Sequence, residues 1–368
     1  MTFEIITTRN CNLNCKYCFE GEKKDVFLSI DVIPEILDYI DSFLKNDFIY
    51  NKEYVRIDFN GGEALLNKKF IIEFMNKTKT KNFDYSITTN GLLLDEDLIN
   101  IINDNKIKIQ ISLDGRKISH DLNRQYYNGE GSFDAVFEKA ILLKKKYWES
   151  FFSVSLVFTP ETVYDLADNI KFLLENEFYE ISFSPCLDFE WKENDIKEFD
   201  KQMKQIGKIY IDYMMNEKEI YLSQLSDAFD IILNNFQKSH CGACTDMITI
   251  LPNGNILPCG GFVGCTNENE ISVGNISNDL DYEKINFYVF QKKLKVNDQD
   301  CNLCVLNSRC HHICFAVNNR IMHDRLKICP IICRLNQLSI IEADYVFDYL
   351  VKNNNKTFKR MYHGYFEK

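Results

Sequence analysis

The sequence lacks any long hydrophobic run and any excess of basic residues. No stretch approaches the about 18 consecutive apolar residues of a membrane-spanning helix. A secretory signal begins with a basic segment followed by an apolar one. The first residues here, Met-Thr-Phe-Glu-Ile-Ile, contain no such basic segment. The formal net charge is −11, whereas a nucleic-acid-binding protein normally presents a basic field. We therefore expect a cytoplasmic protein that binds neither a membrane nor nucleic acid.

The composition is that of an ordinary folded protein. Hydrophobic residues make up 45% and charged residues 26% of the 368 residues, enough for two or three domains with a substantial core. The 14 cysteines are unevenly placed: three lie between 11 and 18, Cys186 is isolated, and ten lie between 241 and 333. In a reducing compartment, clustered cysteines indicate metal sites rather than disulfides.

The first cysteine group has the spacing Cys11-x3-Cys15-x2-Cys18. Three thiolates on one short loop can hold three irons of a cubane cluster and leave the fourth iron without a protein ligand. The alternative is zinc, but a structural zinc ion takes four protein ligands, and the next cysteine is Cys186. With Tyr17 directly before the last cysteine, the loop resembles that of the radical S-adenosylmethionine (SAM) superfamily. The resemblance implies a [4Fe–4S] cluster whose open iron chelates the amino and carboxylate groups of SAM.

Strand-like and helix-like segments alternate along the first half of the chain. The strands are expected at 3–7, 54–60, 83–89, 106–113, 152–158 and 179–184, and helices are expected at 33–44, 95–103, 132–147, 164–177 and 192–217. Such alternation predicts parallel β/α units, and six units fall short of the eight in a complete barrel. The resemblance implies an α/β fold of this kind, a partial (β/α)6 TIM-like barrel.

Parallel β/α folds place their sites on the loops after strand ends, where several suggestive residues occur. Gly61, Gly62 and Glu63 follow the second strand, Asn90 the third, and Ser112 the fourth, with Arg124 further on. The resemblance implies that these residues and Tyr17 contact SAM, with Glu63 at its amine and Arg124 suited to its carboxylate. The alternative is turn chemistry, because Asn-Gly and Asp-Gly are favoured turn pairs, and Tyr17 can also be a packed loop aromatic.

The composition changes near residue 238, where the second group of cysteines begins. Apolar runs on both sides of Asn253-Gly254 predict a β-hairpin, whose closure brings Cys244 and Cys259 together. The spacings Cys244-x9-Gly254-x4-Cys259 and Cys301-x2-Cys304-x5-Cys310-x3-Cys314 resemble the SPASM domain, a small cysteine-rich domain with a hairpin and loops that bind iron–sulfur clusters.

The SPASM resemblance implies two auxiliary [4Fe–4S] clusters, which makes three clusters in all. The first would be held by Cys241, Cys244, Cys259 and Cys314. The second would be held by Cys301, Cys304, Cys310 and a late cysteine, for which Cys329 is preferred and Cys333 is the alternative. A zinc-ribbon pair is the competing interpretation. Cys186 and Cys265 have no assigned role and are expected to be small buried residues, although Cys186 is also a weak candidate for a catalytic thiol.

The expected organisation is a radical SAM barrel at 1–237, a SPASM domain at 238–336, and a C-terminal helix and tail at 337–368. The helix itself is expected at 335–352, and the last sixteen residues are expected to be a frayed tail. The resemblance implies reductive cleavage of SAM to a 5′-deoxyadenosyl radical and hydrogen abstraction from a residue of a ribosomally synthesised peptide. The expected products are oxidative, such as a thioether or another crosslink.

Two alternative functions stay open. The first is maturation of anaerobic sulfatases by formylglycine formation, which is disfavoured because Gly260-Gly261 follow Cys259 where those maturases carry an aspartate. The second is a non-catalytic electron-transfer or scaffold protein. The expected partners are a precursor peptide and an electron donor of the flavodoxin or ferredoxin type. Because the first strand begins too early to leave room for a leader-binding domain, leader recognition is expected from the barrel rim, the C-terminal segment or a separate leader-binding protein.

Overall fold

The computed structural model describes residues 1–46, 54–146, 152–233, 241–278, 280–291, 301, 303–310 and 314–362. These residues form two compact units. The first consists of Met1–Ser112, Asn123–Phe152 and Gly242–Lys295, and the second of Leu113–Leu122, Ser153–Cys241 and Val296–Lys368. The domain boundaries expected after residues 237 and 336 stay predictions.

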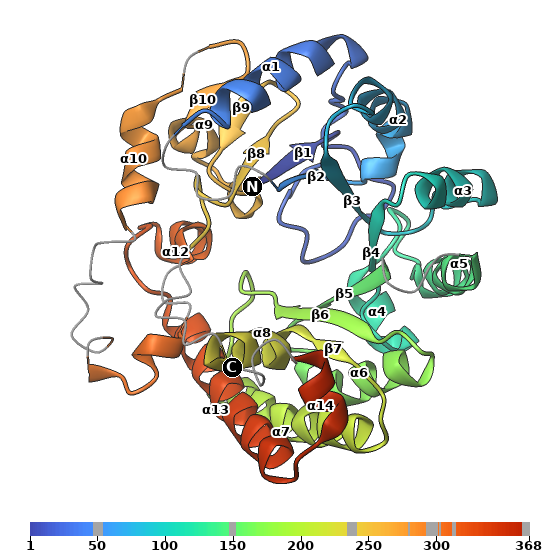
Figure 1. The fold of residues 1–368 in the computed structure, drawn as a ribbon, viewed down its shortest axis with the longest axis vertical. Coiled ribbons are helices and arrows are strands. Elements are labelled where there is room, and N and C mark those ends of the chain that lie inside the picture. Colours follow the sequence, from blue (N-terminus) through green and yellow to red (C-terminus); the bar gives the residue numbers. More distant parts are fainter. Residues whose placement is uncertain are drawn as a thin grey trace. The chain divides into compact units, whose positions relative to one another are not determined.

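The first unit is built on a twisted sheet, drawn from blue to teal and in gold in Figure 1. Among the described residues its strands follow the order β10 (Gly274–Asn275), β9 (Asn255–Leu257), β8 (Met247–Ile250), β1 (Thr2–Ile6), β2 (Val55–Asn60), β3 (Phe83–Thr89) and β4 (Lys108–Ser112). Strands β1 to β4 pair in parallel, and β8 lies parallel to β1 on its other side. Strand β9 turns back antiparallel to β8. The hairpin therefore extends the sheet that carries the first cysteine loop.

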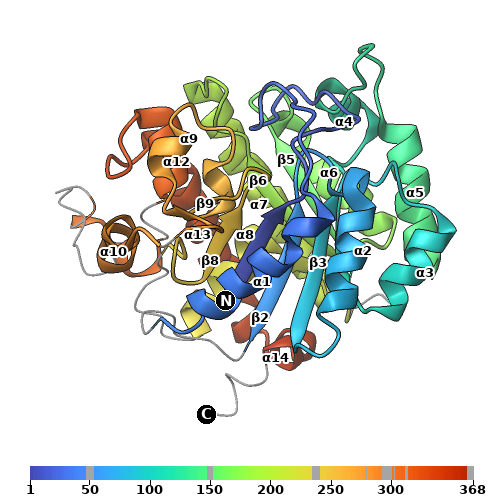
Figure 2. The same cartoon turned by 90° about the horizontal axis from the view of Figure 1, so that it is seen from above.

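Helices cover one face of this sheet, as Figure 2 shows for α1 and α2. Helix α1 buries Ile33, Ile36 and Ile40 at helical spacing, and Phe43 at its end meets Phe3 of β1 edge to face. Such spacing makes an apolar stripe that packs on a sheet. The helical elements of this unit are η1 (Ile30–Val32), α1 (Ile33–Phe43), η2 (Ala64–Asn67), α2 (Lys68–Lys77), α3 (Glu96–Asp104), α5 (Phe133–Lys146), η5 (Gly260–Phe262), α9 (Glu268–Ile271) and α10 (Tyr282–Gln291).

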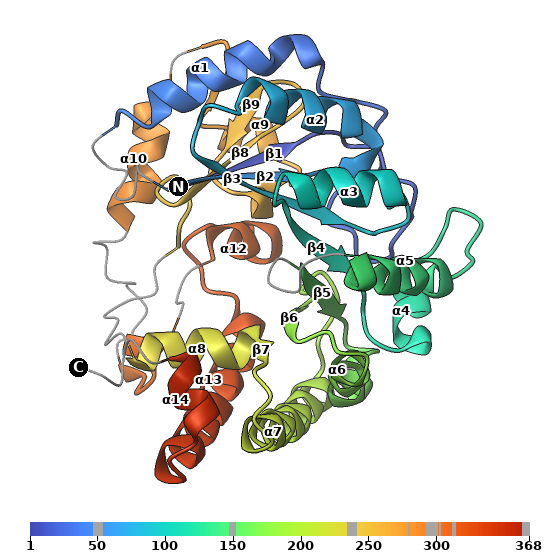
Figure 3. The same cartoon turned by 45° about the vertical axis from the view of Figure 1, so that its right-hand side comes forward.

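The second unit combines a short parallel sheet with a group of helices. Strands β5 (Phe152–Phe158), β6 (Glu180–Pro185) and β7 (Tyr221–Leu222) pair in that order. The two long helices α7 and α13 pack against each other, with α8 and α14 beside them (Figure 3). Its helical elements are α4 (Lys117–Asn123), η4 (Val163–Asp165), α6 (Leu166–Glu175), α7 (Glu193–Met215), α8 (Ser223–Leu233), η6 (Asn307–Arg309), α12 (Phe315–Met322), α13 (Pro330–Lys352) and α14 (Lys356–Met361).

The elements agree with the sequence pattern in their order and type. All six predicted strands are present within two residues of the predicted bounds, and the hairpin lies on both sides of Asn253-Gly254. The last residue of the helix predicted at 132–147 lies outside the described residues. In the part of the chain that the structure describes, no helix is long and apolar enough to cross a membrane.

Two predictions for the C-terminal region were wrong. The helix expected at 335–352 begins five residues earlier, at Pro330, because proline at the first helical position has its φ already set and needs no hydrogen-bond partner. The frayed tail is partly ordered: residues 356–361 form α14, and the fully buried Phe358 meets the ring of Phe229 at a centroid distance of 5.4 Å.

Candidate functional site

The first cysteine loop leaves the C-terminal end of β1 and is held by buried hydroxyl groups. Thr7 and Thr8 are fully buried; the Thr7 hydroxyl donates to the Ala64 carbonyl at 3.2 Å, and the Thr8 hydroxyl donates to the Val26 carbonyl at 2.8 Å. The Asn10 side chain accepts the Cys11 N–H at 2.8 Å. These contacts fix the backbone on which the three cysteines stand.

The thiols of this loop sit among N–H donors. The Leu13 N–H donates to the Cys11 sulfur at 3.4 Å, and the Lys23 ammonium donates to the Cys18 sulfur at 2.5 Å. Burial raises the pKa of the Cys11 thiol to about 12, a rise that the Leu13 N–H opposes. A buried thiol with this pKa is converted to its thiolate by a bound metal rather than by solvent.

Gly61 and Gly62 let the next loop lie directly on the cysteine loop. The Gly62 N–H donates to the Thr8 carbonyl and the Glu63 N–H donates to the Asn10 carbonyl, both at 2.9 Å. A Cβ on Gly62 would lie 2.3 Å from the Asn10 oxygen, and one on Gly61 would lie 2.4 Å from the Thr8 oxygen. The glycines therefore make room for the backbone of the cysteine loop, and their expected contact with SAM stays a prediction.

The Glu63 carboxylate connects this loop to the end of β3. It is 2% exposed and accepts the Thr89 hydroxyl at 2.7 Å, the Asn90 N–H at 2.8 Å and the Leu65 N–H at 3.0 Å. Burial raises its pKa, and these three donors oppose the rise. Because a carboxylate offers about four acceptor positions, Glu63 keeps capacity for one further donor.

The remaining predicted SAM residues of this unit also border the cysteine loop. The Asn90 amide donates to the Asn12 side chain at 2.7 Å and lies 3.9 Å from the Cys11 sulfur. The Arg124 guanidinium, 7% exposed, lies over the Tyr17 ring at 5.2 Å from its centroid. Ser112 is the last residue of β4. The structure thus brings the loop together with Gly61, Gly62, Glu63, Asn90 and Arg124.

Tyr127 and Lys23 are further residues at the loop that the sequence analysis missed. The Tyr127 hydroxyl donates to the Cys11 carbonyl at 3.3 Å, and Lys23 is the cation at Cys18. The proximity of Lys23 in sequence to the last cysteine was a usable signal. Tyr127 had none, because its contact depends on the path of the chain after Arg124.

The hairpin brings two cysteines to its base, as the Asn-Gly turn predicted. The Cys244 N–H donates to the Pro258 carbonyl at 3.0 Å, and Cys259 follows directly. Cys244 is fully buried. The other two residues expected at this site, Cys241 and Cys314, belong to the second unit, so their part in a first auxiliary cluster stays a prediction.

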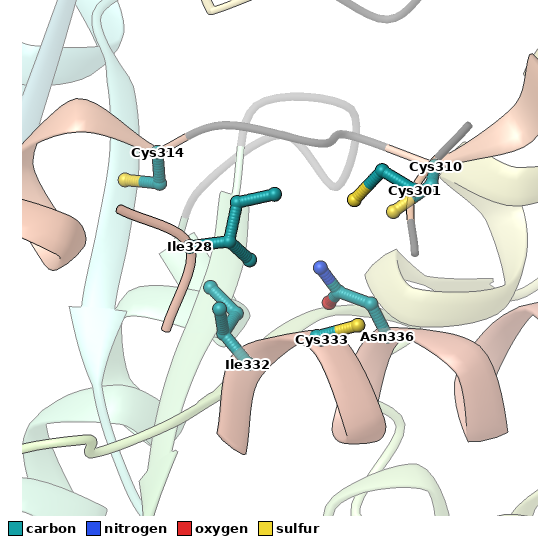
Figure 4. A pocket seen from close by; sticks show the side chains of 7 residues that line it. All are labelled: Cys301, Cys310, Cys314, Ile328, Ile332, Cys333 and Asn336. Carbon is teal, nitrogen blue, oxygen red and sulfur yellow. The ribbon is translucent and has the colours of Figure 1, made fainter. Parts of the chain in front are cut away.

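A small cavity in the second unit is lined by cysteines from the late part of the chain (Figure 4). Its lining residues are Cys301, Cys310, Cys314, Ile328, Ile332, Cys333 and Asn336. Figure 4 shows the Cys301 and Cys310 sulfurs side by side above the first turns of α13, which carries Cys333, whereas the Cys314 sulfur lies on the far side of Ile328. Burial raises the pKa of Cys310 to about 12, and the nearby Cys333, Cys301 and Cys304 add to the rise.

Cys329, the preferred fourth ligand in the sequence analysis, is not among these lining residues. It is 1% exposed, and its N–H donates to the Asn318 side chain at 3.1 Å. The unassigned Cys186 is 8% exposed at the end of β6, where its carbonyl accepts the Trp191 indole N–H at 2.9 Å. Cys265 is half-buried, with its N–H on the Phe262 carbonyl.

The cysteine arrangement can be compared with what zinc and an iron–sulfur cluster require. Among the described residues, no three His, Cys, Asp or Glu side chains lie close enough to hold one metal ion. A tetrahedral zinc ion with Zn–S bonds of about 2.3 Å needs sulfurs roughly 3.8 Å apart, whereas thiolates on separate irons of a cubane stand further from one another. The choice between zinc and iron–sulfur clusters at the second group of cysteines stays a prediction.

The chain is similar to known enzymes of one superfamily. Residues 5–173 match the family model of the radical SAM superfamily. The cysteine-type anaerobic sulfatase-maturating enzyme of Clostridium novyi (strain NT) is 27% identical over 271 residues, which are 69% of this chain and 71% of that protein. The radical SAM cyclopropyl synthase TigE of Paramaledivibacter caminithermalis is 22% identical over 335 residues, 85% and 67% of the two chains.

Solved structures show the same fold. Native anSMEcpe with bound AdoMet and the Cp18Cys peptide matches with a TM-score of 0.77 at 23% identity, covering 96% of this chain and 99% of that one. Streptococcus suis SuiB bound to the precursor peptide SuiA matches with a TM-score of 0.58 at 18% identity, covering 86% and 72%. The predicted fold class, a partial barrel followed by a cysteine-rich region, is confirmed.

Proposed function

The chain belongs to the radical SAM superfamily, and from this premise we propose that it oxidatively modifies a residue of a ribosomally synthesised peptide. The family implies bound SAM and a [4Fe–4S] cluster. These cofactors would supply the difficult chemistry when bound, namely one-electron cleavage of SAM to methionine and a 5′-deoxyadenosyl radical that can remove a hydrogen atom from a substrate carbon. The arrangement that carries the proposal is the cysteine loop with Glu63, Asn90 and Arg124 beside it.

Each of these side chains has a task that its position suits. Cys11, Cys15 and Cys18 would bind three irons, and the remaining acceptor position on Glu63 would receive the SAM ammonium. Arg124 lies over the Tyr17 ring, and a guanidinium at this place would suit the SAM carboxylate. Asn90 links the loop to β3 and so keeps the two walls of the SAM site together.

A peptide is the substrate class that the relatives support. SuiB was solved with a precursor peptide and anSMEcpe with the Cp18Cys peptide. Sulfatase maturation stays the second candidate because those maturases are among the relatives found. An electron-transfer protein has no use for an open iron beside Glu63 and Arg124, so we place that alternative last.

For the auxiliary sites we propose two further [4Fe–4S] clusters. In the second, the fourth ligand is Cys333 in place of Cys329, because Cys333 lines the same cavity as Cys301 and Cys310. Cys304 would be the remaining ligand, and it belongs to the group that perturbs Cys310. For the first auxiliary cluster, the SPASM resemblance implies Cys241, Cys244, Cys259 and Cys314, and this assignment stays a proposal.

The function can be tested with reconstituted protein under anaerobic conditions. Short cysteine-containing peptides, including any encoded beside this chain's gene, are incubated with SAM and a strong reductant, and 5′-deoxyadenosine and intact peptide mass are measured. We expect 5′-deoxyadenosine release together with a peptide lighter by two hydrogens. The Cys15→Ala variant, which cannot complete the loop cluster, is the negative control. No 5′-deoxyadenosine from the wild-type chain would refute the enzyme assignment.

A further inference from the structure

The carboxylate of Glu4 connects β1 to its two neighbouring strands. In the register of the sheet, Glu4 faces Asp58 on β2 and Thr249 on β8. Its Oε1 accepts the Asn60 amide at 2.8 Å, and its Oε2 accepts the Thr249 hydroxyl at 2.6 Å. Strand alternation places it on the face opposite Phe3 and Ile5, which are fully buried, and Glu4 itself is half-buried.

The same carboxylate lies against the backbone that follows the hairpin cysteine Cys259. A Cβ on Gly260 would lie 2.0 Å from Glu4 Oε2 and 2.6 Å from Oε1. The Glu4 carboxyl group thus occupies the space that a side chain at position 260 would take. A residue 256 positions earlier in the chain supplies a carboxylate at a place where the local sequence, Gly260-Gly261, has none.

The surroundings of Glu4 suit a proton acceptor. Its two hydrogen-bond partners, an amide and a hydroxyl, carry no charge, and the charged neighbour on β2 is another carboxylate, Asp58. Burial raises the pKa of Glu4 to about 7; Asp58 adds to the rise, and Thr249 and Asn60 oppose it. A carboxylate with this pKa can accept and release a proton near neutral pH.

We propose that Glu4 accepts the proton that the substrate loses during its oxidation. The proposal rests on the oxidative function proposed above and adds a residue to it. Removal of two hydrogens from a peptide divides into a hydrogen atom, which passes to the 5′-deoxyadenosyl radical, an electron, and a proton. The auxiliary clusters would take the electron, and Glu4 takes the proton, so that atoms and charge balance.

The first test is the Glu4→Gln variant of the full chain with its clusters reconstituted. Gln has the size of Glu but cannot take up a proton. We expect modified peptide to fall by at least about a hundredfold, the usual contribution of a general base, while 5′-deoxyadenosine is still released. Product formation within twofold of wild type would overturn the proposal. Parallel loss of 5′-deoxyadenosine and of iron would also overturn it, since the carboxylate would then be structural.

A second test uses the shared position of Glu4 and Gly260. Glu4→Ala should lose product in the same way, and the double variant Glu4→Ala/Gly260→Asp, which returns a carboxylate to the vacated space, should recover at least tenfold. The matched control is Glu4→Ala/Gly261→Asp, because Gly261 is exposed and an aspartate there adds the same charge elsewhere. Equal recovery in both double variants, or none in the first, would contradict the assignment.

A third measurement does not depend on a peptide. Infrared difference spectra between pH 5.5 and 8.5 should contain a protonated-carboxyl contribution of Glu4 that is lost in Glu4→Gln, whereas the contribution of Glu342, whose pKa burial also raises to about 7, stays in both proteins. If the wild-type chain cleaves SAM but modifies no peptide, the proposed substrate class is wrong. The infrared difference between the two proteins still tests whether Glu4 exchanges a proton near neutral pH. Identical difference spectra of the two proteins would overturn its role.

Discussion

Glu342 on α13 carries a pH dependence of stability that a single substitution should remove. Its side chain is 7% exposed and packs on α7 at Gly207, where a Cβ would lie 2.0 Å from the Glu342 Oε1. Burial raises the pKa of Glu342 to about 7; Asp200 adds to the rise, and Lys204 opposes it. The interface between the two long helices therefore holds a carboxyl group that prefers to be protonated.

The sign of the effect follows from the raised pKa. The protonated form stabilises the folded chain below the ordinary pKa of 4.5, and this contribution is lost as the pH rises through about 7. A rise from 4.5 to about 7 corresponds to about 3 kcal/mol. Because Gln has no proton to lose, Glu342→Gln should exceed the wild type by up to this amount above pH 8, or about 4 °C in Tm for a chain of this length.

The assay is anaerobic differential scanning at several pH values and one scan rate. We expect the two Tm values to be similar near pH 4.5, to diverge between pH 5 and 7, and to keep a constant difference above pH 8. Asp348→Asn is the control, because it removes an exposed carboxylate from the same helix. A Tm difference independent of pH, or a wild type that is more stable at pH 8, would refute the reasoning.

Three further predictions concern the late cysteines, the loop after β2 and the ion pair beside the first cysteine loop. Cys333→Ser should lower the iron content by up to about four per chain, whereas Cys329→Ser should retain it. In Gly62→Ala the new methyl group would lie 2.3 Å from a backbone oxygen of the cysteine loop. We therefore expect the free energy of unfolding to fall by about 1–3 kcal/mol and SAM cleavage to be lost. Arg9→Gln removes the guanidinium that pairs with the buried Glu20 at 2.8 Å, which should lower Tm by the equivalent of about 3 kcal/mol.

Each of these predictions has a comparison that can contradict it. Iron analysis of the two cysteine variants side by side would reverse our ligand assignment if Cys329→Ser were the depleted one. Wild-type SAM cleavage in Gly62→Ala would show that the two loops do not need their close contact. Substituting Glu20 as well, in Arg9→Gln/Glu20→Gln, should recover part of the Tm, since the double variant removes the unpaired Glu20 carboxylate but leaves Glu268 without its guanidinium; no recovery would argue against the Glu20 carboxylate as a cause.

Much of the fold followed from local patterns. The strands of the first unit alternate buried and half-exposed residues in β2 and β4, and the spacing of Ile33, Ile36 and Ile40 is that of a helix. Such periodicities depend only on neighbours in the chain. The cysteine loop and the hairpin could likewise be predicted, because the ligands are close in sequence and Asn253-Gly254 fixes the turn.

The choice between Cys329 and Cys333 depended on where a helix begins. We expected the helix from 335 onwards, which left both cysteines in a loop. Because α13 begins at Pro330, Cys333 lies in its first turn. Asn336 lies about one turn further along the same face of the helix. Proline after Cys329 was the available start signal, and weighing it would have favoured Cys333.

The neighbourhood of Glu4 and Gly260 could not be read from the sequence, because it depends on the parallel pairing of β1 with β8 across about 245 residues.

The position of Glu4 also bears on the choice between the two candidate functions. The glycines after Cys259 disfavoured sulfatase maturation only because they cannot take a proton, and Glu4 brings a carboxylate to the same place. If Glu4 acts as proposed, both candidate reactions have a proton acceptor, and the product alone decides between them. A peptide crosslinked at its cysteine has lost two hydrogens and has no aldehyde, whereas a formylglycine made from cysteine has lost two hydrogens, carries oxygen in place of sulfur and reacts with hydrazides. Hydrazide labelling of the modified peptide, combined with its intact mass, therefore separates the two functions in a single sample.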